Sequence, residues 1–258
     1  MRACGTAPMV LCPAAASLAV SNDERPMTRL LPLLTLLAAL AFAASPLTTQ
    51  GFNGFTADQF PIPQVDPPVQ PAGYAFAIWG VIYLWLILGA GFGLWKRARD
   101  PDWQRMRPPL LASLAIGAAW IPVANAAPVA ATAMIWAMLA GAVAALVRSG
   151  PRDPWWQRAP VALYAGWLTA AASVALGLVA AGHGLLSAEA AALAALALAL
   201  ACALAVILRG PRAPAYGTAV AWALGGVVVS NLAPLNLPVL TLAGAGLLLT
   251  GVLTLRRS

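Results

Sequence analysis

Long apolar runs separated by short polar segments fill the sequence from residue 30 to its end. Within each run Ala, Leu, Val and Ile are continuous and do not alternate with polar residues. Continuous runs indicate transmembrane helices, whereas the strands of a membrane barrel alternate every second residue. The pattern predicts eight helices, at Leu30–Ala44, Tyr74–Trp95, Pro109–Ala124, Val129–Val147, Ala159–Ala181, Ala188–Leu208, Ala215–Leu232 and Val239–Leu255.

The basic residues occur only in every second polar segment. Lys96–Arg107, Arg148–Arg158, Arg209–Arg212 and the carboxyl end are basic, and the segments between them contain no Lys or Arg. All 15 Lys and Arg residues therefore fall on one predicted side of the membrane. The positive-inside rule assigns that side, and both termini, to the cytoplasm.

Composition agrees with this topology. The chain is 61% hydrophobic and 9% charged, whereas a soluble domain carries about a quarter charged residues. The net charge of +7 is explained by the basic loops, so no nucleic-acid partner is expected. We expect an all-α, polytopic helical bundle in a bacterial inner membrane, with the lipid bilayer as its first partner.

The amino-terminal region allows two interpretations. Residues 1–26 are irregular, and they are either a disordered tail or an extension upstream of the true start at Met27. Leu30–Ala44 is either a retained first helix or a cleaved signal, because Ala41–Ser45 resembles a signal-peptidase site. A proline-rich outer segment follows on either interpretation.

Aromatic residues supply the main functional signal. The stretch Pro71-Ala-Gly-Tyr-Ala-Phe-Ala-Ile-Trp-Gly-Val-Ile-Tyr83 opens the second helix, where Trp79 and Tyr83 share a face. Tyr164 and Trp167 share a face of the fifth helix. Such residues predict an aromatic-lined cavity for a flat, largely apolar ligand. By contrast, four tryptophans beside basic residues are assigned to an interfacial belt: Trp95, Trp103, Trp155 and Trp156.

Catalytic and metal-binding patterns are missing from the sequence. No Ser/His/Asp set, pair of catalytic carboxylates, phosphate-binding Gly loop or metal-ligand cluster is visible. The lone His183 lies in a predicted outer turn, and Cys4, Cys12 and Cys202 show no paired spacing. We therefore expect no catalytic residue, no metal site and no required cofactor.

Several motifs resemble the tryptophan-rich sensory protein / translocator protein (TspO, peripheral benzodiazepine receptor) family. Phe-x-x-Trp-Gly-x-x-Tyr, ending at Tyr83, resembles that family's second-helix signature. Ala119-Trp-Ile-Pro122 and Trp136-Ala-Met-Leu139 resemble its third- and fourth-helix motifs. Pro160-Val-Ala-Leu-Tyr-Ala-Gly-Trp167, continuing to Ala171, resembles its fifth-helix motif.

The resemblance implies a five-helix core whose pocket opens toward the loop between the first two helices. The family's pocket binds porphyrins, so a porphyrin or haem-type ligand is the implied small aromatic partner. By motif match, the lining residues would be Trp79, Tyr83, Trp120, Trp136, Tyr164, Trp167 and Ala171. Two positions depart from the family, because Ala175 replaces a frequent Asn and Ala118 a further aromatic residue.

The expected organisation is a tail at 1–29, a TspO-like five-helix domain at 30–181 and a three-helix extension at 182–258. The expected function is a membrane ligand-binding sensor or carrier for flat apolar molecules such as tetrapyrroles. A transporter of small apolar or zwitterionic cargo is the alternative, and enzymatic porphyrin breakdown is the least supported hypothesis. The oligomeric state, a homodimer included, stays open.

Overall fold

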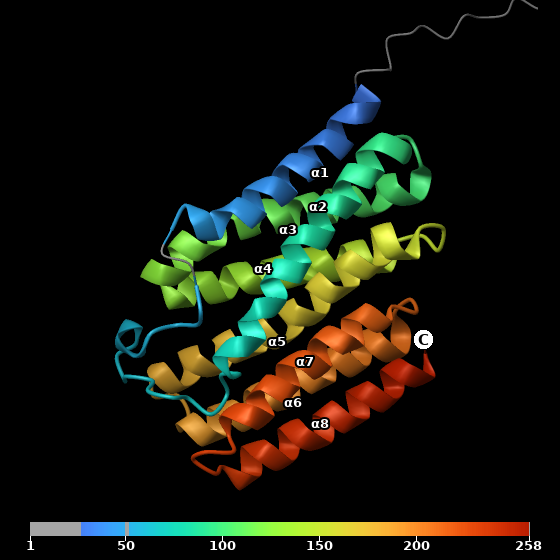
Figure 1. Cartoon of the computed structure of the whole chain (residues 1–258). Coiled ribbons are helices and arrows are strands. Elements are labelled where there is room, and N and C mark those ends of the chain that lie inside the picture. The colour runs from blue at the N-terminus through green and yellow to red at the C-terminus, as the bar shows by residue number, and fades with distance from the viewer. Residues whose placement is uncertain (1–26, 50–51, 258) are drawn as a thin grey trace, which may run out of the picture.

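The computed structural model describes residues 27–49 and 52–257, and this part of the chain forms eight α-helices and no strand (Figure 1). The helices are α1 (Met27–Ala44), α2 (Ile78–Lys96), α3 (Pro101–Ala126), α4 (Pro128–Arg148), α5 (Ala159–Gly182), α6 (Ala188–Arg209), α7 (Pro214–Ser230) and α8 (Leu237–Arg256). The predicted all-α bundle is confirmed, and every predicted apolar run coincides with one helix. The two interpretations of residues 1–26 concern a segment outside the described residues.

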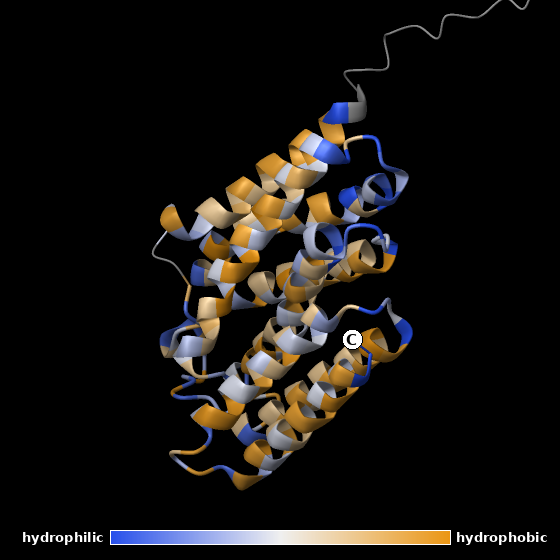
Figure 2. Ribbon diagram, turned by 45° about the vertical axis from the view of Figure 1, so that its right-hand side comes forward, coloured by the Kyte–Doolittle hydropathy of each residue, from blue (hydrophilic) through white to orange (hydrophobic). Residues whose placement is uncertain are grey.

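The helices have the dimensions of membrane spans. Seven of those described are long and apolar enough to cross a membrane, judged by length and composition. The eighth, α7, has 17 residues, and at 1.5 Å per residue it is about 26 Å long. Figure 2 shows hydrophobic residues along the helices and hydrophilic residues concentrated at the connections.

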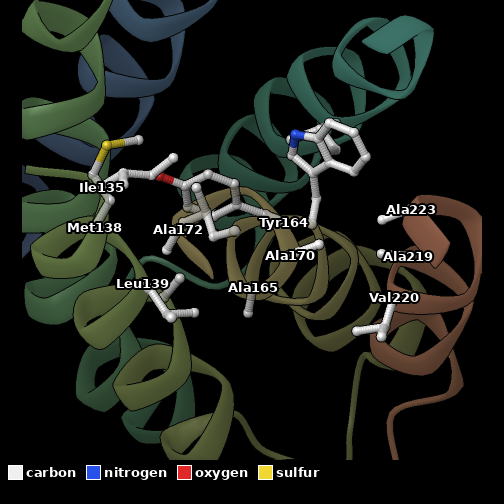
Figure 3. Packing of buried hydrophobic residues seen from close by; sticks show 14 of the residues in the cluster. Ile135, Met138, Leu139, Tyr164, Ala165, Ala170, Ala172, Ala219, Val220 and Ala223 are labelled. Carbon is white, nitrogen blue, oxygen red and sulfur yellow. The ribbon is translucent and has the colours of Figure 1, made fainter. Parts of the chain in front are cut away.

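Helix α5 lies at the centre of the bundle. It packs against α4 on one side and against α6 and α7 on the other. Figure 3 shows Tyr164 of α5 pointing toward Ile135 and Met138 of α4, while α7 presents Ala219 and Ala223 to the other side of α5. The buried core is continuous from Ala39 on α1 to Ala243 on α8. The proposed division at residues 181 and 182 therefore stays a prediction, with one core running across it.

Helix α1 is built into this core. It packs against α2 and α3, and its Phe42 is only 2% exposed. The Phe42 ring lies edge-on to the rings of Trp79 and Tyr83, with centroids 5.8 and 5.0 Å away. These contacts favour a retained first helix over a removed signal, and the retention of Leu30–Ala44 stays a prediction. The helix also includes residues 27–29, which the sequence had assigned to the tail.

Helix α3 begins eight residues earlier than predicted. Asp100 caps it by accepting hydrogen bonds from the backbone N–H groups of Asp102 and Trp103, and Pro101 occupies its first position, both typical helix-start features. The assignment of Trp103 to an interfacial belt was wrong, because Trp103 is 2% exposed. Arg107 is buried with it and donates to the carbonyls of Gly93 (2.9 Å) and Arg97 (3.1 Å). Because of this cap, the later part of the basic segment belongs to α3, with Trp103 and Arg107 on the buried face of the helix.

All Lys and Arg residues of the described ranges lie at one end of the bundle, which we call the basic end. It contains the α2–α3, α4–α5 and α6–α7 connections and the end of α8. Asp153 joins two of these connections. It accepts hydrogen bonds from Arg97 Nε (2.8 Å), Arg97 Nη2 (3.1 Å) and Trp103 Nε1 (2.9 Å). The bonds from Arg97, followed by the bond from Trp103, lower the pKa of the Asp153 carboxyl.

Replacing Asp153 by alanine should lower the free energy of unfolding by about 1–3 kcal/mol, because the buried Trp103 N–H loses its acceptor. Asp102→Ala is the matched control, since it costs only the helix-dipole interaction of about 0.5 kcal/mol. Unfolding of purified protein in detergent measures both. Because the folded pKa is depressed, the Asp153 contribution is present above the unfolded pKa of about 3.9 and is lost as pH falls through the folded value. Equal losses in the two variants would contradict this role of Asp153.

Candidate functional site

A cavity lies against α5 near the end of the bundle opposite the basic end. Its volume is about 60 Å³, measured as the space open to the centre of a water-sized sphere. Helix α5 provides one wall, α6 and α7 provide the opposite wall, and the segment 52–76 covers it. Almost all of its lining atoms are apolar, with Ala170, Ala195, Ala199 and Ala223 leaving room where larger residues would fill the space.

The covering segment is bound to α7 by a series of hydrogen bonds. Ala72 N–H donates to the Gly226 carbonyl (3.0 Å), and Ser230 Oγ donates to the Gln70 carbonyl (2.9 Å). Asn231 Nδ2 donates to Pro68 (2.8 Å) and Trp222 Nε1 to Ala75 (2.9 Å). The segment approaches α7 closely at Gly226, which has no side chain. A Cβ added to Gly226 would lie 2.8 Å from Pro71 Cβ. We call residues 52–76 the cover.

Two residues that line the cavity each carry a buried polar atom with no hydrogen-bond partner among the described residues. The atoms are Trp167 Nε1, on a side chain that is 2% exposed, and Gln70 Oε1. A buried donor or acceptor without a partner costs about 1–3 kcal/mol, so a bound molecule that pairs with either atom recovers that cost. The walls of the cavity therefore hold one donor and one acceptor that remain to be satisfied.

Three of the seven predicted site residues line this cavity, namely Trp120, Trp167 and Ala171. Trp120 Nε1 donates to the Ala131 carbonyl (2.8 Å), and its ring lies edge-on to Phe52 of the cover at 4.7 Å. Ala171 is partly exposed within the cavity region. Of the departures from the family pattern, Ala175 also lines the cavity, which leaves this part of the wall apolar.

The other four predicted residues lie outside the cavity lining. Trp79 stacks on Tyr83 at 5.3 Å, and both contact Phe42. Tyr164 is fully buried, with its hydroxyl 2.9 Å from Ser113 Oγ. Trp136 is partly buried and packs on the core from α4. Trp79 also contacts a cavity-lining residue, since its ring lies edge-on to Trp167 with centroids 6.0 Å apart.

Sequence reasoning missed the contribution of α6, α7 and the cover. Their small residues, such as Ala199 and Ala223, carry no chemical signal that separates them from other Ala-rich positions. The cover offered a weak signal, since Phe52 and Phe55 are unusual in a polar, proline-rich segment. Within the described ranges, no group of three or more His, Cys, Asp or Glu residues could hold a metal ion.

A bundle with seven described helices long and apolar enough to cross a membrane defines a multi-pass integral membrane protein. A model of the TSPO-like protein family matches residues 29–255. The chain therefore belongs to the TSPO-like family, and the match includes α6, α7 and α8 as well as the first five helices. Comparison with curated proteins and with solved structures gives no match.

Proposed function

We propose that this protein binds a flat, apolar small molecule, of the tetrapyrrole type, in the cavity between α5, α6, α7 and the cover. The observation that carries the proposal is the buried, unpartnered Trp167 Nε1 in an otherwise apolar cavity. An indole N–H in this position suits a carbonyl or carboxylate of the ligand, and the aromatic rings of Trp120 and Phe52 suit its flat face. Membership of the TSPO-like family supports a ligand-binding role.

The volume of the cavity implies that the ligand enters by displacing the cover. A drug-sized ligand needs about 300–1,000 Å³, whereas the cavity offers about 60 Å³ to water-sized centres. The cover is not α-helical and is joined to α7 by four hydrogen bonds, whereas α5 packs extensively against both α6 and α7. We infer that the cover is the wall that yields. Its hydrogen bonds to α7 then break on opening and reform on closure.

The placement of the protein is part of the same proposal. We infer a bacterial inner membrane with both termini in the cytoplasm, supported by the collection of all described Lys and Arg residues at the basic end. The cover and the cavity then face the opposite side, from which the ligand enters. Transport of the ligand stays a prediction that flux into proteoliposomes would test.

Titration of purified protein with protoporphyrin, followed by tryptophan fluorescence quenching, tests the binding proposal. The Trp167→Phe variant keeps an aromatic ring and loses the N–H, so the affinity should fall about 2- to 10-fold. Trp95→Phe is the matched control, because Trp95 is 77% exposed and lies outside the cavity. No saturable binding would overturn the proposed function, and equal affinities in the two variants would remove Trp167 from the site.

A further inference from the structure

A second hollow lies at the basic end, where Ala159 and Leu163 at the start of α5 line it. It has a volume of about 440 Å³, again for the centre of a water-sized sphere, and it opens between η5 (Pro154–Arg158), α5 and the α6–α7 connection. Trp85, Trp155, Arg158, Leu163, Arg212 and Thr218 are among its lining residues. We call it the basic groove. It shares no lining residue with the ligand cavity, and the sequence motifs did not predict it.

Two tryptophans form a fixed apolar wall of the basic groove. The rings of Trp85 and Trp155 stack with centroids 6.1 Å apart and 27° between their planes. Trp85 Nε1 also donates to the Trp155 carbonyl at 2.9 Å. Trp155 is nevertheless 70% exposed, so its other face is open. Tryptophans with an apolar face and a polar tip concentrate at the depth of lipid headgroups.

Two guanidinium groups flank the same groove without an acidic partner. Arg158 is partly buried, and it donates only to Ser149 Oγ (3.3 Å), the Ser149 carbonyl (3.2 Å) and the Arg212 carbonyl (3.4 Å). The Arg212 side chain is exposed and makes no hydrogen bond or ion pair with another described residue. The ion pairs of the described chain are Arg97–Asp153 and Arg152–Asp100, so neither groove arginine is neutralised.

The apolar lining of the basic groove favours a lipid over a soluble anion. Its lining is almost entirely apolar apart from the two arginines and Thr218. On α7, Thr218 and Trp222 are four residues apart and both exposed, so an exposed strip of this helix continues from the groove toward the middle of the bundle. A soluble anion would use the charges and leave this strip empty, whereas an acyl chain would cover it.

We propose that the basic groove binds an anionic phospholipid, whose phosphate pairs with Arg158 and Arg212 and whose acyl chain lies along α7. Basic pockets between membrane helices on the cytoplasmic side are suited to anionic headgroups. Arg158 contributes a preorganised guanidinium, since its bonds to Ser149 and to the α6–α7 connection hold it at the groove. Arg212, on the α6–α7 connection, supplies the second guanidinium at the same groove.

Native mass spectrometry of the full-length protein in detergent tests the proposal. The protein is titrated with phosphatidylglycerol and, separately, with phosphatidylcholine of identical acyl chains. Both lipids carry a phosphate, but the choline cation cancels its charge in phosphatidylcholine. Two arginines, each worth about a fivefold gain near a net anionic headgroup, predict up to about 25-fold tighter binding of phosphatidylglycerol. Arg212→Gln should remove about fivefold of that preference, and Arg158→Gln should do the same.

Arg209→Gln is the matched control, because Arg209 is exposed at the same end of the bundle but does not line the groove. This variant should retain the full preference for phosphatidylglycerol. Arg212 is exposed, so its substitution tests the site even if Arg158→Gln fails to fold. Equal binding of the two lipids, or an equal loss in Arg209→Gln, would overturn the proposal. Complete displacement of phosphatidylglycerol by millimolar inorganic phosphate would assign the groove to a soluble anion instead.

Discussion

The Gly166→Leu variant is expected to be less stable than the parent protein by about 3 kcal/mol or more, the upper end of overpacking costs. Gly166 lies where α5 crosses α7. A Cβ built there would overlap the backbone carbonyl of Tyr216 and would meet Ala219 Cβ at 3.0 Å. Backbone atoms cannot move aside as a flexible side chain does, so the whole of α7 would have to shift. Because α7 also holds the cover, ligand binding should fall with stability.

Gly225→Leu provides the control for that experiment. Gly225 lies on α7, and a Cβ built there has no neighbouring atom within 4 Å. Replacing a helical glycine at an open position should be neutral or stabilising, by up to about 1 kcal/mol. Unfolding in detergent, followed by tryptophan fluorescence, measures both variants. Equal unfolding midpoints for the two would show that the α5–α7 crossing is looser than the structure indicates.

A leucine in place of Ala199 should weaken protoporphyrin binding by about 10- to 100-fold. Ala199 is 6% exposed and lines the cavity from α6. Three further carbon atoms would occupy the space, and a ligand would have to displace them at an overpacking cost of about 1–3 kcal/mol. Fluorescence quenching measures the affinity. The variant should fold, since the added atoms fill a void.

Two control variants show whether a loss of protoporphyrin binding in Ala199→Leu is specific to the cavity. Ala201→Leu lies two residues further along α6 and is exposed, so binding should be unchanged. Trp136→Phe alters a residue that the family resemblance implied for the site but that lies outside the cavity lining, so its affinity should also be unchanged. If Trp136→Phe weakened binding and Ala199→Leu did not, the ligand would occupy a pocket within the first five helices.

The number, order and approximate limits of the helices were predictable because a membrane helix must be continuously apolar. The ends of α3 were less predictable, since the cap at Asp100 extends that helix into a segment of arginines. The candidate site was predictable only in part. Trp120, Trp167 and Ala171 follow from recognisable motifs, whereas Ala199 and Ala223 matter by being small. Whether a small side chain leaves a cavity depends on which helix packs opposite it, and the sequence does not show how the helices pack.

The bonds between the cover and α7 also set an order of events during synthesis. Ala75 and Trp222, which are joined by a hydrogen bond, are 147 residues apart in the chain. At about 5–20 residues per second, the cover is made about 7–30 s before its partner helix. During that interval α1 to α6 can insert while the cover has no α7 residues to bond and the cavity has no α7 wall. Insertion of α7 is therefore the step that completes the ligand-binding site of the nascent protein.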